Sequence, residues 1–102
     1  MTKSQLIEHI SLKLPHLQQR DVEMAINITI EVMTQHLEQG ERVEIRGFGG
    51  FSVIERAARM GRNPKTGEQV RLLIRHSTHF KPGLDLRERV ERSRAAVPIN
   101  GD

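Results

Sequence analysis

The sequence contains no cysteine, no tryptophan and no tyrosine, so phenylalanine is its only aromatic residue. The absence of cysteine excludes disulfide bonds, thiolate metal sites and thiol nucleophiles, and it is compatible with the reducing cytosol. No apolar run approaches the length that crosses a bilayer, and the first residues lack the apolar core of a signal peptide. We therefore expect a soluble intracellular protein with no membrane partner.

Hydrophobic residues are also scarce: they make up 36% of 102 residues and include three phenylalanines. A chain of this length corresponds to one domain near the lower limit for a self-sufficient core. We predict a single domain over residues 1–92 and a flexible tail over residues 93–102, where no hydrophobic periodicity occurs. The small apolar fraction indicates that the chain buries further surface against another subunit.

Charge is present but unevenly distributed, with a formal net value of only +3. Residues 1–40 contain three cations and five acids, whereas residues 41–80 contain eight cations and four acids. The excess is concentrated in residues 56–75, where six cations accompany the single acid Glu68. Like charges repel one another, so this segment indicates an external polyanion, and nucleic acid is the first candidate.

Helices are predicted near both ends of the chain. Thr2 and Gln5 have the spacing of a capping box, so a helix should begin at Lys3 and end before Pro15. A short helix is predicted over residues 84–92, after the breaker sequence Lys81-Pro82-Gly83.

The second helix should begin within residues 18–22 and end at Gly40. Its hydrophobic residues occupy a sector about 200° wide, roughly twice what packing on one side requires. We therefore predict that it contacts its own subunit and a second one, although a central helix in a monomeric bundle is the alternative. The residues assigned to the subunit interface are Ala25, Ile28, Val32, Phe48, Phe51 and Phe80.

Alternation of apolar and polar residues predicts strands over residues 43–45, 51–56 and 70–80. The segment between the last two has almost no core-forming residues. If both strands continue outward as a ribbon, the arm over residues 56–75 extends ~25 Å at 3.3 Å per residue. Its tip would be residues 63–67, which are rich in turn formers.

Pro64 lies at this predicted tip. One possible role of a proline after Asn63 is to form the turn. The other is a rigid apolar wedge that enters between base pairs and kinks a duplex while arginines follow the minor groove.

Several motifs in fixed order resemble those of the bacterial HU/integration host factor family. They are Arg46-Gly47-Phe48-Gly49, Phe51, the run from Arg59 to Gly67 that includes Gly61-Arg62-Asn63-Pro64, and Phe80-Lys81-Pro82-Gly83. The similarity extends over about residues 1–92. The opening residues 1–4 and the run 39–49 favour the integration host factor branch of the family.

The resemblance implies an α+β fold and an intertwined dimer with a helical base, a small antiparallel β saddle and two extended two-stranded β-ribbon arms. The arms of such proteins embrace double-stranded DNA and bend it by proline intercalation from the minor groove, which is a property of the family and not a deduction from spacing. It also implies a location in the bacterial nucleoid and roles in recombination, replication, transcription control and nucleoid organisation.

Position by position, the resemblance makes Pro64 the intercalating residue. It also makes the arm residues that line the minor groove Arg59, Arg62, Asn63 and Lys65. Arg46 would lie near flanking DNA, and Lys3 and Lys81 would lie where phosphates are clamped at helix starts. The remaining cations of the middle segment complete the predicted set. The full DNA-binding set is Lys3, Arg42, Arg46, Arg56, Arg59, Arg62, Asn63, Pro64, Lys65, Arg71, Arg75 and Lys81.

Two other classes of function compete with this prediction. An enzyme would need a nucleophile with a base at recognisable spacing, and none occurs; His76 and His79 should lie on opposite faces of a strand, which argues against a shared metal site. We expect no catalytic residue, metal, cofactor or small-molecule substrate. A protein-interaction module would explain the second helix but not the charges of the arm.

Within the DNA-binding class, two alternatives stay open at this point. The partner is either a related alpha-type subunit, giving a sequence-selective heterodimer, or a second copy, giving a nonspecific packaging homodimer. The charged strand over residues 42–46 favours the heterodimer. Two features depart from the family pattern: the apolar run Leu72-Leu73-Ile74 in the arm, and the tail after Ser93.

Overall fold

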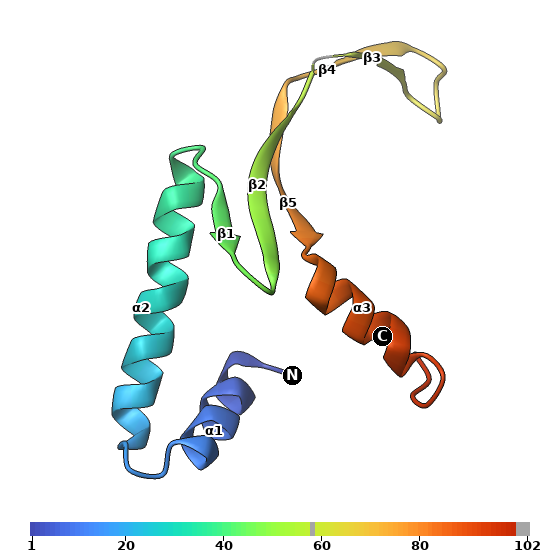
Figure 1. The fold of residues 1–102 in the computed structure, drawn as a ribbon. Helices are drawn as coiled ribbons and strands as arrows, with labels where there is room; N and C mark the ends of the chain where they lie inside the picture. Colours follow the sequence, from blue (N-terminus) through green and yellow to red (C-terminus); the bar gives the residue numbers. More distant parts are fainter. Residues whose placement is uncertain (58, 100–102) are drawn as a thin grey trace.

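The computed structural model describes residues 1–57 and 59–99, with the backbone alone at Arg59 and Leu72. Helices and antiparallel strands occupy separate parts of the chain, so the predicted α+β class is confirmed (Figure 1). The elements are, in order, α1 (Lys3–Lys13), α2 (Gln19–Glu38), β1 (Val43–Ile45), β2 (Gly49–Arg56), β3 (Arg59–Arg62), β4 (Gln69–Leu72), β5 (Arg75–Pro82) and α3 (Leu84–Ser93).

Local side-chain and backbone contacts determine where the first two helices begin and end. The Thr2 hydroxyl accepts a hydrogen bond from the Gln5 amide at 3.2 Å, and the Thr2 amide donates to the Gln5 side chain at 2.9 Å. After α2, Gly40 adopts φ +78°, and its amide donates to the Leu37 carbonyl at 3.0 Å. Both are the predicted caps, because a capping box starts α1 and a left-handed glycine ends α2.

The isolated chain has almost no hydrophobic core. Among the described residues, only Ile7 and Val22 are buried hydrophobics, with 5% and 3% of their surface exposed, at the contact between α1 and α2. Four large apolar side chains elsewhere on α2 are about half exposed, as Ile28 is at 56%; the other three are Met24, Ile30 and Val32. A single subunit therefore leaves uncovered the apolar surface that would normally form the centre of a domain.

The main sheet has the order β1-β2-β5, and both neighbouring pairs are antiparallel. Its register aligns Val43 with Phe51 and Phe51 with Phe80, so these side chains share one face. The Phe80 ring contacts Phe51 at a centroid distance of 4.7 Å and Phe48, from the β1–β2 turn, at 5.4 Å. The apolar face of the sheet is therefore centred on the three phenylalanines.

The arm differs from the prediction in one respect, because the continuous strand expected over residues 70–80 is wrong. The ladder between β2 and β5 ends at the pair Arg56–Arg75, and β3 and β4 form a separate two-stranded sheet. Leu73 and Ile74 lie outside both ladders. In the described part of the chain no helix lies beside β3 and β4, and the arm curves away from the main sheet (Figure 1).

The last helix begins at Leu84, as predicted, and ends one residue later than predicted, at Ser93. Beyond it the amides of Ala96 and Val97 donate to the Ser93 carbonyl at 3.1 and 2.9 Å. Flexibility of the tail stays a prediction, and residues 100–102 lie outside the described part of the chain.

The two buried glycines at the start of β2 allow a stability prediction. A Cβ atom at Gly49 would lie 2.6 Å from the Lys81 carbonyl oxygen and 2.7 Å from the Phe80 ring. We expect Gly49→Ala to lower the free energy of unfolding by about 2 kcal/mol, because paired backbone cannot move aside. Gly50→Ala is the matched control: its Cβ would meet the guanidinium end of Arg42, which can rotate away. Thermal denaturation of both variants measures the difference, and equal stabilities would contradict the prediction.

Candidate nucleic-acid interface

The face of the sheet opposite the phenylalanines is basic. Side chains alternate along a strand, so the pairs Arg56–Arg75, Ser52–His79 and Gly50–Lys81 share this face. The Arg42 guanidinium lies over Gly50 on the same side. We call this surface, formed by Arg42, Arg56, Arg75, His79 and Lys81, the basic face.

A groove of about 380 Å³ lies at the edge of the basic face, between the β1–β2 turn and the start of α3. Four cations line it, namely Arg42, Arg46, Lys81 and Arg87, against the single carboxylate of Glu44. Gly83 precedes the first turn of α3 and supplies no side-chain cap. The groove thus combines cationic side chains with the positive end of a helix, which is suited to a phosphate group.

Arg87 is a groove residue that the sequence analysis missed. It lies one turn into α3, where its amide donates to the Gly83 carbonyl at 3.0 Å. No spacing within one element marks it, because Arg87 and Lys81 line the same groove only through the turn between β5 and α3.

The Arg42 guanidinium lies 3.8 Å from the Glu44 carboxylate, which can therefore orient this cation. Glu44 is paired with Gly50, so it is the acid among the cations of the basic face.

The arm extends the positive charge beyond the sheet. Arg62 is paired with Gln69 and Arg71 with Met60, so both arginines lie on one face of the ribbon. The described residues include no carboxylate within 4.0 Å of the arm cations. Arg59 lies in β3, and its side chain is outside what the structure describes.

The tip is a hydrogen-bonded turn with Pro64 exposed at its end, as predicted. The Asn63 amide donates to the Glu68 carbonyl at 2.8 Å, and the Gly67 amide donates to the Asn63 carbonyl at 2.7 Å. The Asn63 side chain accepts from the Lys65 amide at 2.9 Å, so backbone on both sides of Pro64 is held. A rigid apolar ring therefore ends a cationic arm.

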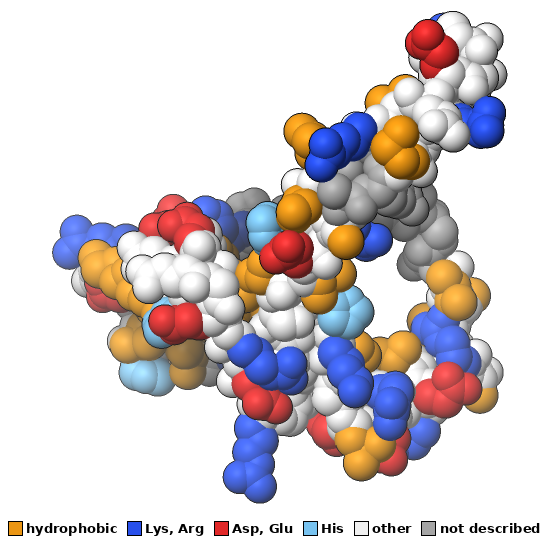
Figure 2. Space-filling view, turned by 90° about the horizontal axis from the view of Figure 1, so that it is seen from above, with side chains coloured by type: hydrophobic (Ala, Val, Ile, Leu, Met, Phe, Trp, Pro, Cys, Tyr) orange, Lys and Arg blue, Asp and Glu red, His pale blue; other side chains and the backbone are white. Residues whose placement is uncertain are grey.

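Lys3 belongs to neither cationic group. It lies at the start of α1, and its ammonium group donates to the Asn27 side chain of α2 at 2.8 Å. The other cations predicted to bind DNA lie on the basic face, in the groove or on the arm, and Figure 2 shows basic side chains at the base and along the arm.

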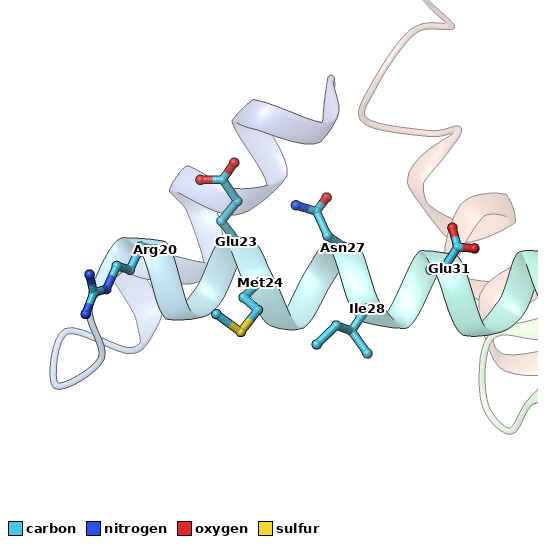
Figure 3. Close-up of a pocket in the computed structure, with 6 residues that line it drawn as sticks. All are labelled: Arg20, Glu23, Met24, Asn27, Ile28 and Glu31. Atoms are coloured by element: carbon cyan, nitrogen blue, oxygen red, sulfur yellow. The ribbon is translucent and has the colours of Figure 1, made fainter.

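The exposed apolar side of α2 forms a second surface, distinct from the cations. A hollow of about 500 Å³ is lined by Arg20, Glu23, Met24, Asn27, Ile28 and Glu31. Figure 3 shows Met24 and Ile28 on one side of the helix, with the polar side chains of Glu23, Asn27 and Glu31 along the other. Of the residues predicted to form the subunit interface, Ala25, Ile28, Val32 and Phe48 are exposed, and Phe51 and Phe80 are half-buried.

Two of the five histidines lie beside carboxylates, and no metal centre occurs within the described residues. His36 Nδ1 lies 2.6 Å from Glu41, and His76 lies 3.6 Å from Glu55. The strand register places His76 and His79 on opposite faces, as expected. No helix in residues 1–57 and 59–99 has both the length and the apolarity that crossing a membrane requires.

A family profile described as bacterial DNA-binding protein matches residues 1–91. The chain belongs to this family. The resemblance to the HU/integration host factor proteins is therefore confirmed, and the family consists of DNA-binding proteins, not enzymes.

Curated relatives and solved structures agree with this assignment. The chain is 57% identical to integration host factor subunit beta of Halorhodospira halophila, covering 97% of both chains, and 60% identical to that of Pseudoalteromonas atlantica, covering 88% and 94%. It is similar to Anabaena HU, solved with DNA, with a TM-score of 0.77 and 30% identity over 88% of this chain and 97% of that one. Thermotoga maritima HU matches with a TM-score of 0.61 and 29% identity, covering 88% and 98%.

Proposed function

We propose that this chain is one subunit of an architectural protein that binds duplex DNA and bends it through the minor groove. The basic face holds the duplex, the arm follows the groove, and Pro64 enters between base pairs. The observation that carries the proposal is continuity: the cations of the sheet lead through Arg56 and Arg75 into those of the arm, which ends in an exposed proline. The similarity to integration host factor beta and to a DNA-bound HU supports it.

Bending follows from the position of Pro64. A wedge that unstacks a base step costs a few kcal/mol, and the energy is recovered when the bent duplex contacts more protein. Here the further contacts are the basic face and the groove that contains Arg46, Lys81 and Arg87.

The functional unit in this proposal is an intertwined dimer, because the apolar side of α2 needs a partner. The favoured partner is a related alpha-type subunit, since the relatives at 57% and 60% identity described above are beta subunits. A homodimer that packages DNA without sequence preference is the alternative. Purification from the native cell distinguishes them: a second, related chain at equal stoichiometry supports the heterodimer.

The proposed setting is the bacterial nucleoid in the cytoplasm, with roles in recombination, replication, transcription control and nucleoid organisation. Binding of a labelled duplex at increasing salt tests the central claim, because each neutralised phosphate releases counterions. Affinity that does not depend on salt would contradict it.

Arg62→Ala tests the groove-following role of the arm. We expect affinity for duplex DNA to fall about tenfold, and the slope of log affinity against log salt to decrease in magnitude by about 0.9, because one phosphate contact is lost. Lys13→Ala, which removes a cation from the last turn of α1, is the matched control and should leave the slope unchanged. A slope for Arg62→Ala equal to that of the wild type would exclude Arg62 from the interface.

A further inference from the structure

The bend of the arm exposes an apolar pair that neither folding nor charge explains. Leu73 and Ile74, which we call the elbow, connect β4 to β5 and have 73% and 53% of their surface exposed. They lie outside both strand ladders. Met60 and Val70, on the adjoining ribbon, are exposed at 59% and 42%.

The pair contributes little to the stability of the chain, because side chains this exposed bury little apolar surface. Its surroundings are cationic: Arg71 precedes the elbow, and Arg75 follows it directly opposite Arg56. A hydrophobic protein docking here would have to desolvate these guanidinium groups or supply acids to pair with them. Figure 2 shows hydrophobic and basic side chains intermixed along the arm.

Duplex DNA combines the two chemistries that this surface offers. Its phosphates pair with the arginines, and the sugar edges that form the walls of the minor groove are its apolar surface. Apolar side chains are a recurring means of contact for proteins that enter this groove. At 3.3 Å per residue, the elbow lies roughly 17 Å from the tip, about half a helical turn of DNA away from Pro64.

We infer that Leu73 and Ile74 pack against the sugar edges of the minor groove and form a second, uncharged contact of the arm with bound duplex. The inference rests on the proposed function and adds to it a contact that no charge explains. The cations attract the duplex at long range, and the elbow contributes only once the groove is in van der Waals contact. The elbow therefore strengthens binding without releasing counterions.

The test is the double substitution Leu73→Ser/Ile74→Ser in the full-length protein with its partner subunit. We expect affinity for a duplex long enough to contact both arms to fall about tenfold. The slope of log affinity against log salt should not change, since no charge is removed. The heat-capacity change on binding should become less negative, because less apolar surface is buried. Leu12→Ser is the matched control, since Leu12 is 81% exposed on α1, away from the arm, and should bind as the wild type does.

A conservative variant distinguishes a lost contact with DNA from a loss of folding stability. Leu73→Met/Ile74→Val retains apolar surface and should bind with wild-type affinity, while thermal denaturation of both elbow variants should match the wild type. Serine variants that bind DNA as tightly as the wild type would overturn the inference, as would a changed salt slope or a changed oligomeric state by sedimentation. A wild-type protein that shows no salt-sensitive binding to duplex DNA would instead contradict the proposed function itself.

Discussion

A single charge on the exposed apolar side of α2 should abolish assembly of the protein. Ile28→Glu places a carboxylate beside Met24, on the surface proposed to contact the partner subunit. Burying an unpaired charge costs several kcal/mol, so we expect the dissociation constant of the dimer to rise by about a thousandfold or more. Because Ile7 and Val22 are the only buried hydrophobic residues among those described in one chain, loss of the partner should also lower the melting temperature sharply.

Sedimentation and circular dichroism measure the two effects together. Thr34→Glu is the matched control, because it introduces the same charge on the polar side of α2, where the hydroxyl of Thr34 bonds only to the Ile30 carbonyl at 2.8 Å. That variant should remain dimeric. An Ile28→Glu protein with wild-type mass and wild-type melting temperature would show that this side of α2 is solvated in the functional unit.

Pro64→Ala should uncouple bending from binding. The cations of the basic face and of the arm are unchanged, so affinity should fall by less than about fivefold, whereas the bend angle should fall by about half because the wedge is missing. Asn63 still holds the turn through the Lys65 amide, so the shape of the tip is not expected to change. Fluorescence transfer between dyes at the ends of a duplex measures the angle directly.

Two controls make the Pro64 result specific. Pro98→Ala removes a proline from the tail and should leave the bend unchanged. A duplex that is nicked where the wedge enters bends with little cost, so the difference between Pro64→Ala and the wild type should disappear on it. An unchanged angle on intact duplex would reject the wedge and leave Pro64 as a turn former.

Local sequence signals predicted most elements of this fold, because caps and turns depend on residues that are close in the chain. The capping box at Thr2, the left-handed Gly40 and the turn around Pro64 each satisfy backbone groups within a few residues. The separation of β4 from β5 could not be predicted in this way. Leu73 and Ile74 continue the apolar run of the expected strand, and nothing in their local sequence marks the point at which the ladder ends.

The candidate interface was likewise predicted in part from local sequence. Charge density alone indicated the arm. The basic face could not be predicted without the strand register, which aligns Lys81 with Gly50, and without the fold, which brings Arg42 over Gly50. Arg87 was missed for a related reason, since its proximity to Arg46 arises from the turn between β5 and α3 and not from spacing within one element. Sequence periodicity assigns a residue to a face, whereas only tertiary structure determines which faces meet.

The near absence of buried hydrophobic residues has a consequence for the amount of this protein in the cell. A subunit whose described hydrophobic core consists of Ile7 and Val22 is expected to unfold readily until it assembles, and unfolded chains are degraded by proteases. If the partner is the proposed alpha-type subunit, assembly would protect each chain, and the steady-state level of this subunit would follow the supply of that partner. The exposed side of α2 would then control abundance, because surplus copies would be removed and the two subunits would accumulate in equal amounts.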